Sequence, residues 1–571
     1  MLNYIRYLSI APIAISITIF LFISFFTLAI LDVIGVFMLG QLISIVIQGT
    51  ESDSIIISLF NSFDITLPRD IIIYLSIAIS SYFILKSLAA YFIQIKLLDV
   101  SYGIMVKMRI ALMNKYLNAD YLDVVVVGFS TIATKINIHC DTYVRGIYIP
   151  LMRLICDLMM LFLLGLFLFG QNPIVFPLFV ICILSSVCFY MLLIKSKLFK
   201  AGKNAALASE IFLSDIKNSI RGIKESKILG KQEYYLAKFS KNVEHLAENI
   251  KLHDKYVILP KYFIEAILVT VMLLLVIVAL WFYGYQNNEA YVMIGYYLAS
   301  SLRIMPSMNQ TIISIGNMRN ATYIVEELQK EFNQIDSIVK KEPKLLNYDK
   351  SIRFDNVSFS YPGSSEKVLK NINILINKGD KVGIIGESGS GKTTFIDILT
   401  GLIQPKEGAL LIDDEKLMDE NKYDWMQKIS FISQNISLFN ASIKENIILD
   451  LDNIDEEKLQ DSVEKSGLSR ELPKFINNID NLIGDEGSFM SGGQKQRIGI
   501  ARAIYHSRDI MVLDEATTGL DADLEKEILG SVYSICKDKT LFIISHNHKI
   551  LSECNVILKI ENGTISQAEL G

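Results

Sequence analysis

Residues 386–393 read GESGSGKT, and residues 490–494 read MSGGQ. A short apolar run, 382–385, comes directly before the first string, and a helix is expected to follow it from Lys392 to Leu402. A strand, a glycine-rich loop and a helix in that order form the context that a phosphate-binding loop requires. The first string therefore predicts a nucleotide-binding α/β domain in the second half of the chain.

The chemistry of this loop follows from its residue types. Glycines let backbone N–H groups approach phosphate oxygens, and the N-terminus of the following helix adds its dipole. The Lys392 ammonium is expected to neutralise the β- and γ-phosphates of ATP, and the Thr393 hydroxyl to bind Mg²⁺. The residues predicted to bind the nucleotide here are Gly386, Glu387, Ser388, Gly389, Ser390, Gly391, Lys392, Thr393 and Thr394.

A second apolar run, Ile510–Leu513, ends in Asp514 and Glu515. Buried parallel strands have continuous apolar sequences of this kind. At the end of such a strand, Asp514 is expected to bind Mg²⁺, and Glu515 to polarise the attacking water as a positioned base. Placed after a phosphate-binding loop, the two carboxylates predict that the site hydrolyses ATP.

On these motifs, residues 350–571 resemble the nucleotide-binding domain of ABC transporters. The string Ser491–Gln494 matches the signature of that family, which contacts ATP held by the other subunit. Met490 stands where leucine is usual, and residues 518–521 read Thr-Gly-Leu-Asp where Ser-Ala-Leu-Asp is usual. Both changes spare the polar contacts, so activity is expected to be retained.

The resemblance also implies roles for single residues. Tyr361 is expected to stack on adenine, with a packed core tyrosine as the alternative, and Asp521 matches a loop across the dimer interface. Gln434 is expected to sense Mg²⁺ and the water, and His546 to contact the γ-phosphate. The set outside the phosphate loop is Tyr361, Gln434, Ser491, Gly492, Gly493, Gln494, Asp514, Glu515, Asp521 and His546, with Thr393, Gln434 and Asp514 as the expected Mg²⁺ ligands.

The composition separates the first half of the chain from the second. Hydrophobic residues make up 51% of the 571 residues, and they are concentrated before residue 320. The net charge is −5, and no basic tail or arginine stripe predicts a nucleic-acid partner. The six cysteines form no CxxC pair, so we interpret them as small buried residues.

Six apolar segments are each long enough to cross a hydrocarbon core, which takes about 20 helical residues. The loop at 195–255 is rich in lysine, whereas the loop at 48–70 is acidic, so both termini are expected in the cytoplasm. The first segment is too long for a cleavable signal peptide. The segments lie at 10–47, 71–97, 146–170, 173–195, 257–284 and 290–314.

The expected fold is therefore multi-domain, with three parts in order along the chain. An all-α transmembrane domain of six helices occupies 1–325, and a charged linker occupies 326–350. An α/β nucleotide-binding domain of the ABC type, with its phosphate-binding loop, occupies 351–571. This division assigns the apolar half to the membrane and the motif-bearing half to ATP.

Two long cytoplasmic connections are expected to be helical, with turning points near 118–127 and 230–238. Each turning point is either a short docking helix that receives force from the ATPase domain or the end of an ordinary helical hairpin. On the outer side, the apolar stretch 54–63 is too short to span a membrane. It is either a helix lying in the membrane interface or a hydrophobic loop cap.

Three cations, Lys86, Lys261 and Arg303, are expected in the inner half of the bilayer. A charged side chain at that depth costs free energy and usually faces a cavity. We expect the three to line a cationic cavity for an anionic cargo. For Lys261 the alternative is a side chain that reaches back to the headgroups.

Acidic residues also lie within the apolar segments. Asp157 follows Arg153 by one helical turn, so an intrahelical ion pair is expected there. Asp32 and Glu265 are expected to pair with cations that the sequence does not identify. The membrane half therefore carries charges of both signs.

By the same resemblance, one phosphate loop and one signature in each chain imply a dimer of two identical chains. The order of membrane spans and ATPase resembles the exporter branch of the ABC family. ATP binding is expected to close the dimer and bias the spans toward an outward state, and hydrolysis to reset them.

The cargo is inferred from a further resemblance. Residues 303–307 read Arg-Ile-Met-Pro-Ser, similar to the lipid-linked oligosaccharide flippases of bacterial glycan assembly, although Gln310 stands where a second arginine is expected. This implies a polyprenyl-pyrophosphate-linked oligosaccharide, its pyrophosphate held by Lys86, Lys261 and Arg303, in a bacterial inner membrane. The alternatives are export of lipid A, a drug, another lipid or a peptide, and a membrane-bound ATP-binding regulator or ATP-gated channel.

Overall fold

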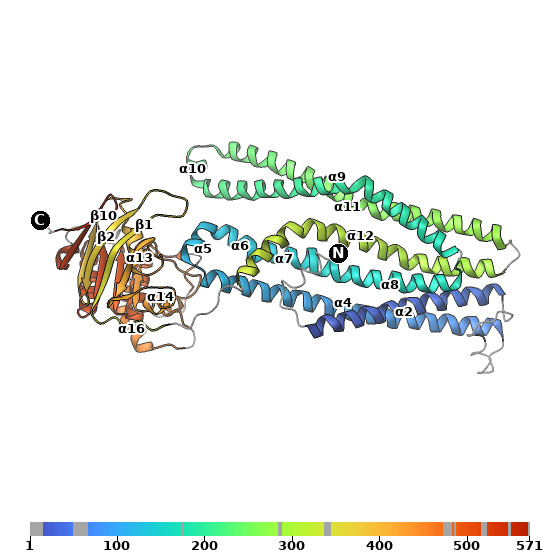
Figure 1. Cartoon of the computed structure of the whole chain (residues 1–571), viewed down its shortest axis with the longest axis horizontal. Coiled ribbons are helices and arrows are strands. Elements are labelled where there is room, and N and C mark those ends of the chain that lie inside the picture. Colours follow the sequence, from blue (N-terminus) through green and yellow to red (C-terminus); the bar gives the residue numbers. More distant parts are fainter. Residues whose placement is uncertain are drawn as a thin grey trace. The chain divides into compact units, whose positions relative to one another are not determined.

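The computed structural model comprises two compact units. The first consists of Met1–Asn118 and Val127–Ile338, and the second of Ala119–Val126 and Val339–Gly571. Figure 1 shows long helices in the first unit and packed sheets with shorter helices in the second. The residues that the structure describes are 15–48, 57, 67–173, 175–283, 288–335, 344–450, 453–471, 482–484, 487–515, 522–545 and 550–568.

The first unit is an assembly of long helices. Helix α4 (Pro68–Asn118) has 51 residues and α11 (Gln232–Tyr283) has 52, whereas a hydrocarbon core takes about 20 helical residues. Both helices therefore extend beyond any bilayer that they cross. The other helical elements are α2 (Ile15–Gln48), α6 (Phe129–Thr134), η3 (Lys135–His139), α7 (Cys140–Tyr143), η4 (Val144–Tyr148), α8 (Ile149–Gln171), α9 (Val175–Arg221), α10 (Ile223–Ile228) and α12 (Asn288–Ile335).

Within the described residues, four helical stretches are long and apolar enough to cross a membrane. They are Ser16–Ile47, Arg69–Asn118, Thr131–Gln171 and Gln232–Val278. The sequence predicted six spans, and the two at 173–195 and 290–314 lie in helices α9 and α12 but are not among these four. The stretch in α12 is less apolar because it carries Arg303 and several serines. Most side chains of 182–195 in α9 are outside the described set.

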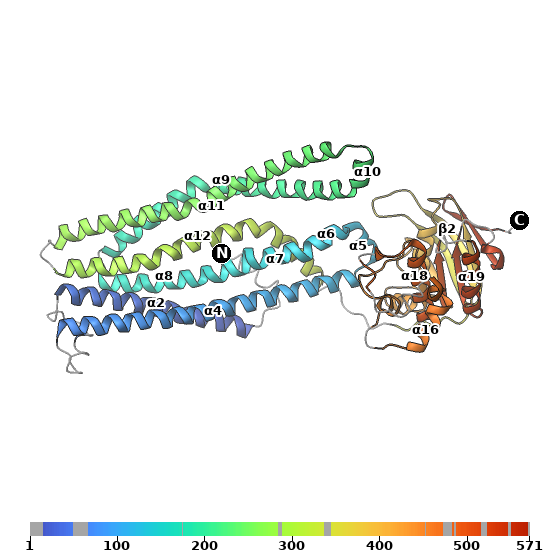
Figure 2. The same cartoon turned by 180° about the vertical axis from the view of Figure 1, so that it is seen from behind.

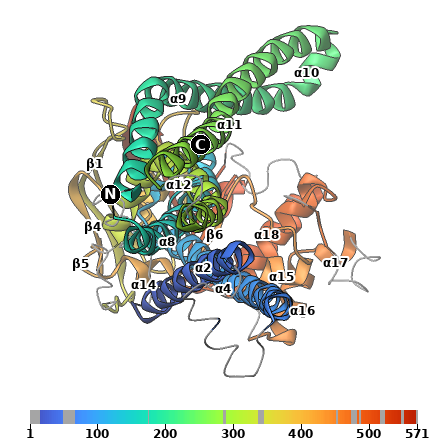
Figure 3. The ribbon, with the colours of Figure 1, turned by 90° about the vertical axis from the view of Figure 1, so that its right-hand side faces the viewer.

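The helices of the first unit pack along their lengths. Figure 2 shows α9 and α11 side by side and joined by α10, and α2 beside α4. In the view along the helices, α12 lies among α8, α2 and α11, each of which it contacts (Figure 3). Gly40 of α2 permits one close approach, since a Cβ there would lie 2.0 Å from the Tyr296 ring of α12.

Helix α12 continues to Ile335, into the stretch 326–350 that the sequence predicted as a linker. Its charged residues have partners inside the unit, because Glu331 forms ion pairs with Lys115 of α4 and Lys135 of η3. Leu328, one turn earlier, is completely buried. Charge alone therefore does not mark the end of this helix, since buried charges are tolerated where they are paired.

The second unit contains two sheets. In the six-stranded sheet the order is β10-β9-β3-β8-β7-β6, and all neighbours are parallel except β10 and β9. The four-stranded sheet is antiparallel, in the order β2-β1-β4-β5. The strands are β1 (Ser351–Phe359), β2 (Leu369–Asn377), β3 (Lys381–Ile385), β4 (Glu407–Ile412), β5 (Glu415–Lys416), β6 (Ile429–Ile432), β7 (Ile510–Asp514), β8 (Thr540–Ile544), β9 (Val556–Glu561) and β10 (Thr564–Gln567).

Helices cover the parallel sheet, and its strands are buried as parallel strands usually are. Every residue of β8 is buried, and so are the first four of β7. Because the strands run in the same direction, the carboxyl ends of β3, β6, β7 and β8 meet at one edge, where ligands of such sheets bind. The helices of this unit are α5 (Tyr121–Val127), α13 (Lys392–Leu399), α14 (Lys422–Met426), α15 (Ile443–Ile448), α16 (Glu456–Lys465), α17 (Leu468–Glu471), α18 (Gly492–His506), α19 (Ala522–Ile535) and the 3₁₀ turn η7 (Ile550–Glu553).

Residues 119–126, which form most of α5, belong to the second unit although α4 and α6 flank them in the chain. Leu122 packs against the apolar core that residues of both sheets form, and Lys422 Nζ donates a hydrogen bond of 2.6 Å to Asp120 Oδ1. A short helix therefore stands at the first predicted turning point. At the second, α10 ends just before a turn at Gly230, whose φ is +61°.

The predicted outer segment 54–63 lies almost entirely outside the described residues. Ile57 is the part of it that the structure describes, and this side chain is buried. It packs in a cluster with Ile45 of α2 and Ile71 and Leu75 of α4.

Candidate functional site

The phosphate-binding loop connects β3 to α13 at the carboxyl edge of the parallel sheet. Gly386 begins it, and a Cβ at this position would lie 2.5 Å from the Ile560 carbonyl oxygen. Gly391 caps α13 with a φ of +108°, a conformation that residues with a side chain rarely adopt. Packing at Gly386 and backbone geometry at Gly391 therefore require glycine at both positions.

Two side chains of this loop fit a bound phosphate. Lys392 Nζ donates to the carbonyl oxygens of Gly386 and Glu387 at 2.8 and 2.9 Å, which places its charge over the loop. The Ser390 hydroxyl is buried without a hydrogen-bond partner in the described part of the chain. Because a buried hydroxyl without a partner costs free energy, the loop favours a ligand that offers acceptors.

Tyr361 stands beside the loop and is not a core residue. Its side chain is 38% exposed, and its ring meets the Phe359 ring edge-on at 5.2 Å between centroids. The Tyr361 hydroxyl forms a hydrogen bond of 3.0 Å with Thr394 Oγ1, and Thr394 is buried in the first turn of α13. The phosphate-loop helix therefore anchors an aromatic ring that solvent can reach.

The end of β7 brings together three of the predicted catalytic and metal-binding residues. Gln434, two residues beyond β6, donates from Nε2 to Glu515 Oε2 at 2.7 Å. Glu515 has a φ of +47°, and its backbone N–H donates to the Ile544 carbonyl of β8 at 3.2 Å. Such strained conformations of residues other than glycine gather at functional sites.

Burial and neighbouring charges raise the pKa of two carboxyl groups at this edge. Burial is the main reason that the pKa of Asp514 is raised, the charge on Glu515 adds to it, and Lys392 opposes it. Burial, with a further contribution from Asp514, raises the pKa of Asp397 in α13 to about 6. Asp514 thus lies within electrostatic reach of Lys392, and the site carries more negative charge than its one lysine neutralises.

The oxygen donors at this edge suit Mg²⁺. The Thr393 hydroxyl, the Asp514 carboxylate and the Gln434 amide oxygen are hard ligands, the kind that Mg²⁺ prefers beside substrate phosphates. Among the described residues, no group of three or more His, Cys, Asp or Glu side chains could hold a metal ion. A site completed by phosphate oxygens is therefore the one that the donors fit.

The signature string forms the start of α18. Ser491 Oγ accepts from the Gln494 N–H at 3.3 Å, and the Ser491 N–H donates to Gln494 Oε1 at 3.0 Å, a reciprocal capping box. A Cβ on Gly492 would meet nothing within 4 Å, so this helix start is open. Met490 is buried against Leu438, which explains why another apolar residue replaces the usual leucine.

Two predicted residues, Asp521 and His546, lie outside the described residues. The other predicted nucleotide residues fall on the phosphate loop, on the carboxyl edge of the sheet or at the start of α18, except Tyr361, which lies beside the loop. Their positions follow from the strand order, but their roles remain predictions.

The three predicted membrane cations are arranged differently from the prediction. Lys86 of α4 and Arg303 of α12 both form ion pairs with Oδ1 of Asp32 in α2. Lys261 of α11 is exposed, with its Nζ 5.8 Å from the centroid of the Tyr262 ring. Lys86 and Arg303 are therefore together and paired, whereas Lys261 belongs to a different place on the unit.

Sequence reasoning predicted that Asp32 pairs with a cation but did not identify Lys86 and Arg303 as its partners. A usable signal was present in the predicted spans, because Asp32, Lys86 and Arg303 are at similar distances from the outer ends of their segments at 47, 71 and 290. Ionisable groups inside a membrane pair with one another, so the similar depth of the three residues would have identified Asp32 as the partner of Lys86 and Arg303. Asp120 and Lys422 gave no comparable signal, because their pairing depends on how α5 packs.

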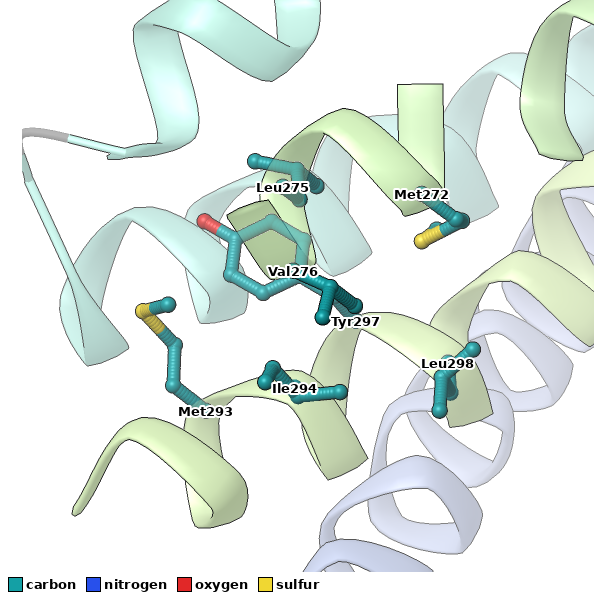
Figure 4. Close-up of a pocket in the computed structure, with 7 residues that line it drawn as sticks. All are labelled: Met272, Leu275, Val276, Met293, Ile294, Tyr297 and Leu298. Carbon is teal, nitrogen blue, oxygen red and sulfur yellow. The ribbon is translucent and has the colours of Figure 1, made fainter. Parts of the chain in front are cut away.

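A small pocket lies between α11 and α12 and contains no charged residue. Figure 4 shows the ring of Tyr297 and the sulfur atoms of two methionines around it. It is therefore an apolar gap between helices and not the predicted cationic cavity. Its lining consists of Met272, Leu275, Val276, Met293, Ile294, Tyr297 and Leu298.

Comparisons with known proteins agree with this geometry. Residues 369–518 match the family described as ABC transporter. An ATP-dependent lipid A-core flippase of Ralstonia nicotianae is 30% identical over 301 residues, which are 51% of this chain and 50% of that protein. An ATP-dependent lipid A-core flippase of Chromohalobacter salexigens is 33% identical over 220 residues, 38% of each protein. The chain thus spans about half or less of the length of these relatives.

One solved structure is similar over nearly the whole chain. It is a bacterial Atm1-family ABC exporter with ATP bound, with a TM-score of 0.77 and 18% identity, and the match covers 95% of this chain and 94% of that one. At that identity the similarity concerns the fold alone. The match of residues 369–518 to the ABC transporter family and this similarity of fold agree with each other, and together they support an exporter-type ABC transporter.

Proposed function

We propose that this chain is one half of an ATP-driven exporter that moves a phosphate-bearing lipid across a membrane. The observation that carries the proposal is the arrangement at the carboxyl edge of the parallel sheet. There Lys392 lies near Asp514, and Gln434 holds the Glu515 carboxylate by a hydrogen bond of 2.7 Å. A phosphate loop, a metal-binding carboxylate and a positioned base at one edge are the parts that ATP hydrolysis requires.

In this proposal, Lys392 exchanges its two backbone carbonyl partners for phosphate oxygens of ATP, and Ser390 gains the acceptor that it lacks. Thr393, Asp514 and Gln434 hold Mg²⁺, which when bound neutralises charge on the phosphates. Glu515 accepts a proton from the attacking water as the bond between the γ-phosphorus and its bridging oxygen breaks. Because Gln434 donates to one Glu515 oxygen, the carboxylate is fixed in orientation before the water arrives.

The proposal requires a second copy of the chain. Ser491, Gly492 and Gly493 at the start of α18 offer backbone N–H groups and a helix dipole, which favour an anion. We infer that they contact ATP held by the phosphate loop of the partner, and that Asp521 and His546 complete this shared site. Closure of the dimer around ATP then biases the membrane helices between two states.

The proposed cargo is an amphiphile that carries phosphate. Arg303 is partly exposed and Lys261 is exposed, so both side chains are available to an anionic headgroup. The resemblance of 303–307 to lipid-linked oligosaccharide flippases favours a polyprenyl-pyrophosphate-linked oligosaccharide. Lipid A is the second candidate, because two relatives are named lipid A-core flippases. Both candidates are glycolipids with phosphate groups, and both fit an inner bacterial membrane with cytoplasmic termini.

Transport by purified protein in proteoliposomes tests the proposal. Flipping of a labelled polyprenyl-pyrophosphate oligosaccharide, labelled lipid A and a labelled cationic drug is measured with Mg-ATP. The Glu515→Gln variant serves as the control that binds ATP but hydrolyses it slowly. We expect ATP-dependent flipping of at least one phosphate lipid by the parent and none by the variant.

The outcomes separate the alternatives. Flipping of the drug alone would replace the cargo but keep the exporter. Hydrolysis without movement of any substrate would favour a regulator, and ATP-dependent ion conductance a channel. An absence of Mg-ATP hydrolysis by the parent would contradict the whole proposal.

A further inference from the structure

A single carboxylate in the membrane unit serves two cations from different helices. Asp32 Oδ1 of α2 accepts from Lys86 of α4 and from Arg303 of α12. Asp32 is 8% exposed and Lys86 is 5% exposed. The sequence predicted that Lys86 and Arg303 line a cationic cavity and left the partner of Asp32 unidentified, whereas the structure has an ion triad that ties three helices together.

The two cations of the triad differ in how much of them is accessible. The Lys86 side chain is 5% exposed, and its Nζ lies 5.2 Å from the centroid of the Phe83 ring. The Arg303 side chain is 41% exposed, although it shares the same carboxylate oxygen. A guanidinium has five donors, so Arg303 can hold Asp32 and a second anion at once. A ligand anion therefore meets Arg303 and not Lys86.

The charged groups around the triad do not cancel its net positive charge. Asp157 of α8 lies within electrostatic reach of Arg153, on the same helix, and of Arg303. The group then contains three cations, Lys86, Arg153 and Arg303, and two carboxylates, Asp32 and Asp157. The named groups leave one net positive charge, and its accessible part is on Arg303.

We propose that Asp32 is the residue that sets the charge specificity of the cargo site, by acting as a built-in competitor for the cargo phosphate. This inference rests on the proposed function. In the protein without cargo, the Asp32 carboxylate is paired with the Lys86 ammonium and with part of the Arg303 guanidinium. A phosphate group that approaches Arg303 is attracted by the one net positive charge of the cluster, while Asp32 stays paired with Lys86. An uncharged lipid is not attracted by this charge and therefore does not bind more tightly because of it.

The competitor has a consequence for turnover. A site with two unpaired cations in a low-dielectric surrounding would hold a phosphate strongly and release it slowly. A transport site must bind firmly enough to load and weakly enough to unload, as in channels. Asp32 halves the cationic charge offered to the cargo, so it lowers affinity in favour of release.

Charge-balanced variants test this inference. In proteoliposomes, the lipid concentration that half-maximally stimulates ATPase activity and the maximal flipping rate are measured for the parent, Asp32→Asn, Lys86→Met and the double variant. The lipid probes are a polyprenyl-pyrophosphate oligosaccharide, lipid A and an uncharged glycolipid. The matched control is Glu265→Gln, since Glu265 is an exposed carboxylate on α11.

We expect Asp32→Asn to lower the half-stimulating concentration of a phosphate lipid by about tenfold and to slow maximal flipping. Lys86→Met should raise that concentration by a similar factor, because Asp32 then neutralises Arg303 alone. The double variant, which again has one net positive charge, should return within about threefold of the parent. Glu265→Gln and the uncharged glycolipid should show no such pattern.

The contrary outcomes are distinct. If the triad only holds the helices together, the double variant will be at least as impaired as either single variant, and its melting temperature will fall with its activity. That result, or an unchanged half-stimulating concentration in Asp32→Asn, overturns the role of Asp32 while the parent still flips its lipid. If the parent flips neither phosphate lipid, the proposed function fails and this inference fails with it.

Discussion

Hydrogen bonds fix both the side chain and the backbone of Glu515 before any substrate binds. Its carboxylate accepts from Gln434, and its backbone N–H donates to β8, so its position follows from the sheet. We expect Glu515→Gln to bind ATP as the parent does and to reduce hydrolysis by about 10²- to 10⁴-fold, the usual contribution of a general base. Phosphate release and ATP binding by filter retention check this. Glu561→Gln, an exposed carboxylate on β9, is the control and should hydrolyse like the parent.

Asp397 allows a prediction about pH and stability. Its pKa in the folded protein is about 6, above the ordinary 3.8, because burial and Asp514 disfavour its charge. The folded state therefore binds this proton more tightly than the unfolded state, and the resulting stability is present at low pH and lost as pH rises through about 6. The loss begins near the unfolded pKa of 3.8 and is nearly complete above about 6, so we expect Asp397→Asn to melt somewhat above the parent near pH 5 and further above it at pH 8.

Thermal melting of the full chain at the two pH values measures this difference. Glu456→Gln, which removes a carboxylate from the exposed face of α16, is the matched control. A gap between Asp397→Asn and the parent that is equal at both pH values, or that closes as pH rises, would contradict the assigned cause.

At the residue scale, the sequence was most informative where backbone geometry dictates residue type. Gly386 and Gly391 are identifiable because no other residue fits the loop, and Glu515 because it follows a buried strand. The sequence was least informative where function depends on a partner in another helix. Asp32 and Lys86 are far apart in the chain, and their ion pair is visible only once α2 and α4 are packed.

At the element scale, α5 belongs to the second unit although it lies between α4 and α6 in the chain, and we propose that it couples ATP hydrolysis to the membrane helices. It continues from α4, and Asp120 just before it pairs with Lys422 of α14 at 2.6 Å. We expect Asp120→Lys to weaken the stimulation of ATPase activity by lipid, and the exchange Asp120→Lys with Lys422→Asp to restore much of it. The pair is partly exposed, so the single change should cost no more than about fivefold.

Lipid-stimulated ATPase activity of the two single variants and the double variant, read as a double-mutant cycle, measures the coupling. Asp123→Lys is the matched control, because Asp123 is an exposed residue of the same helix and undergoes the same charge change. Equal losses in Asp123→Lys and Asp120→Lys would mean that general charge on α5, and not the pair with Lys422, is responsible.

The elements themselves were predicted unevenly. The length of the apolar segments identified the membrane helices, and the strands around the phosphate loop were identified by their apolar runs. The end of α12 was predicted too early, since Glu331 reads as a solvated linker residue until Lys115 and Lys135 are seen beside it. The π-helical turns η3 and η4, which interrupt the helix before α8, have no signature in periodicity because they differ from an α-helix by single residues.

At the scale of the whole molecule, the proposal divides each ATP site between two chains. A variant of the phosphate loop, Lys392→Ala, and a variant of the signature, Ser491→Arg, should each be inactive as a pure dimer, because every site then has one defect. In a mixed dimer both defects fall on the same site, and the other site is intact. Co-purified mixed dimers should therefore regain hydrolysis, up to about a quarter of the parent rate when half of the dimers are mixed.

The control for this experiment mixes two variants of the same half-site, Lys392→Ala with Thr393→Ala. Both are defects of the phosphate loop, so each site of that mixed dimer keeps one defect, and the rate should stay at the level of the pure dimers. Equal rates in the two mixtures would mean that the phosphate loop and the signature of one chain serve the same ATP. The symmetry argument would then fail, because the start of α18, whose N–H groups and dipole favour an anion, would contact ATP bound in its own chain and would need no partner.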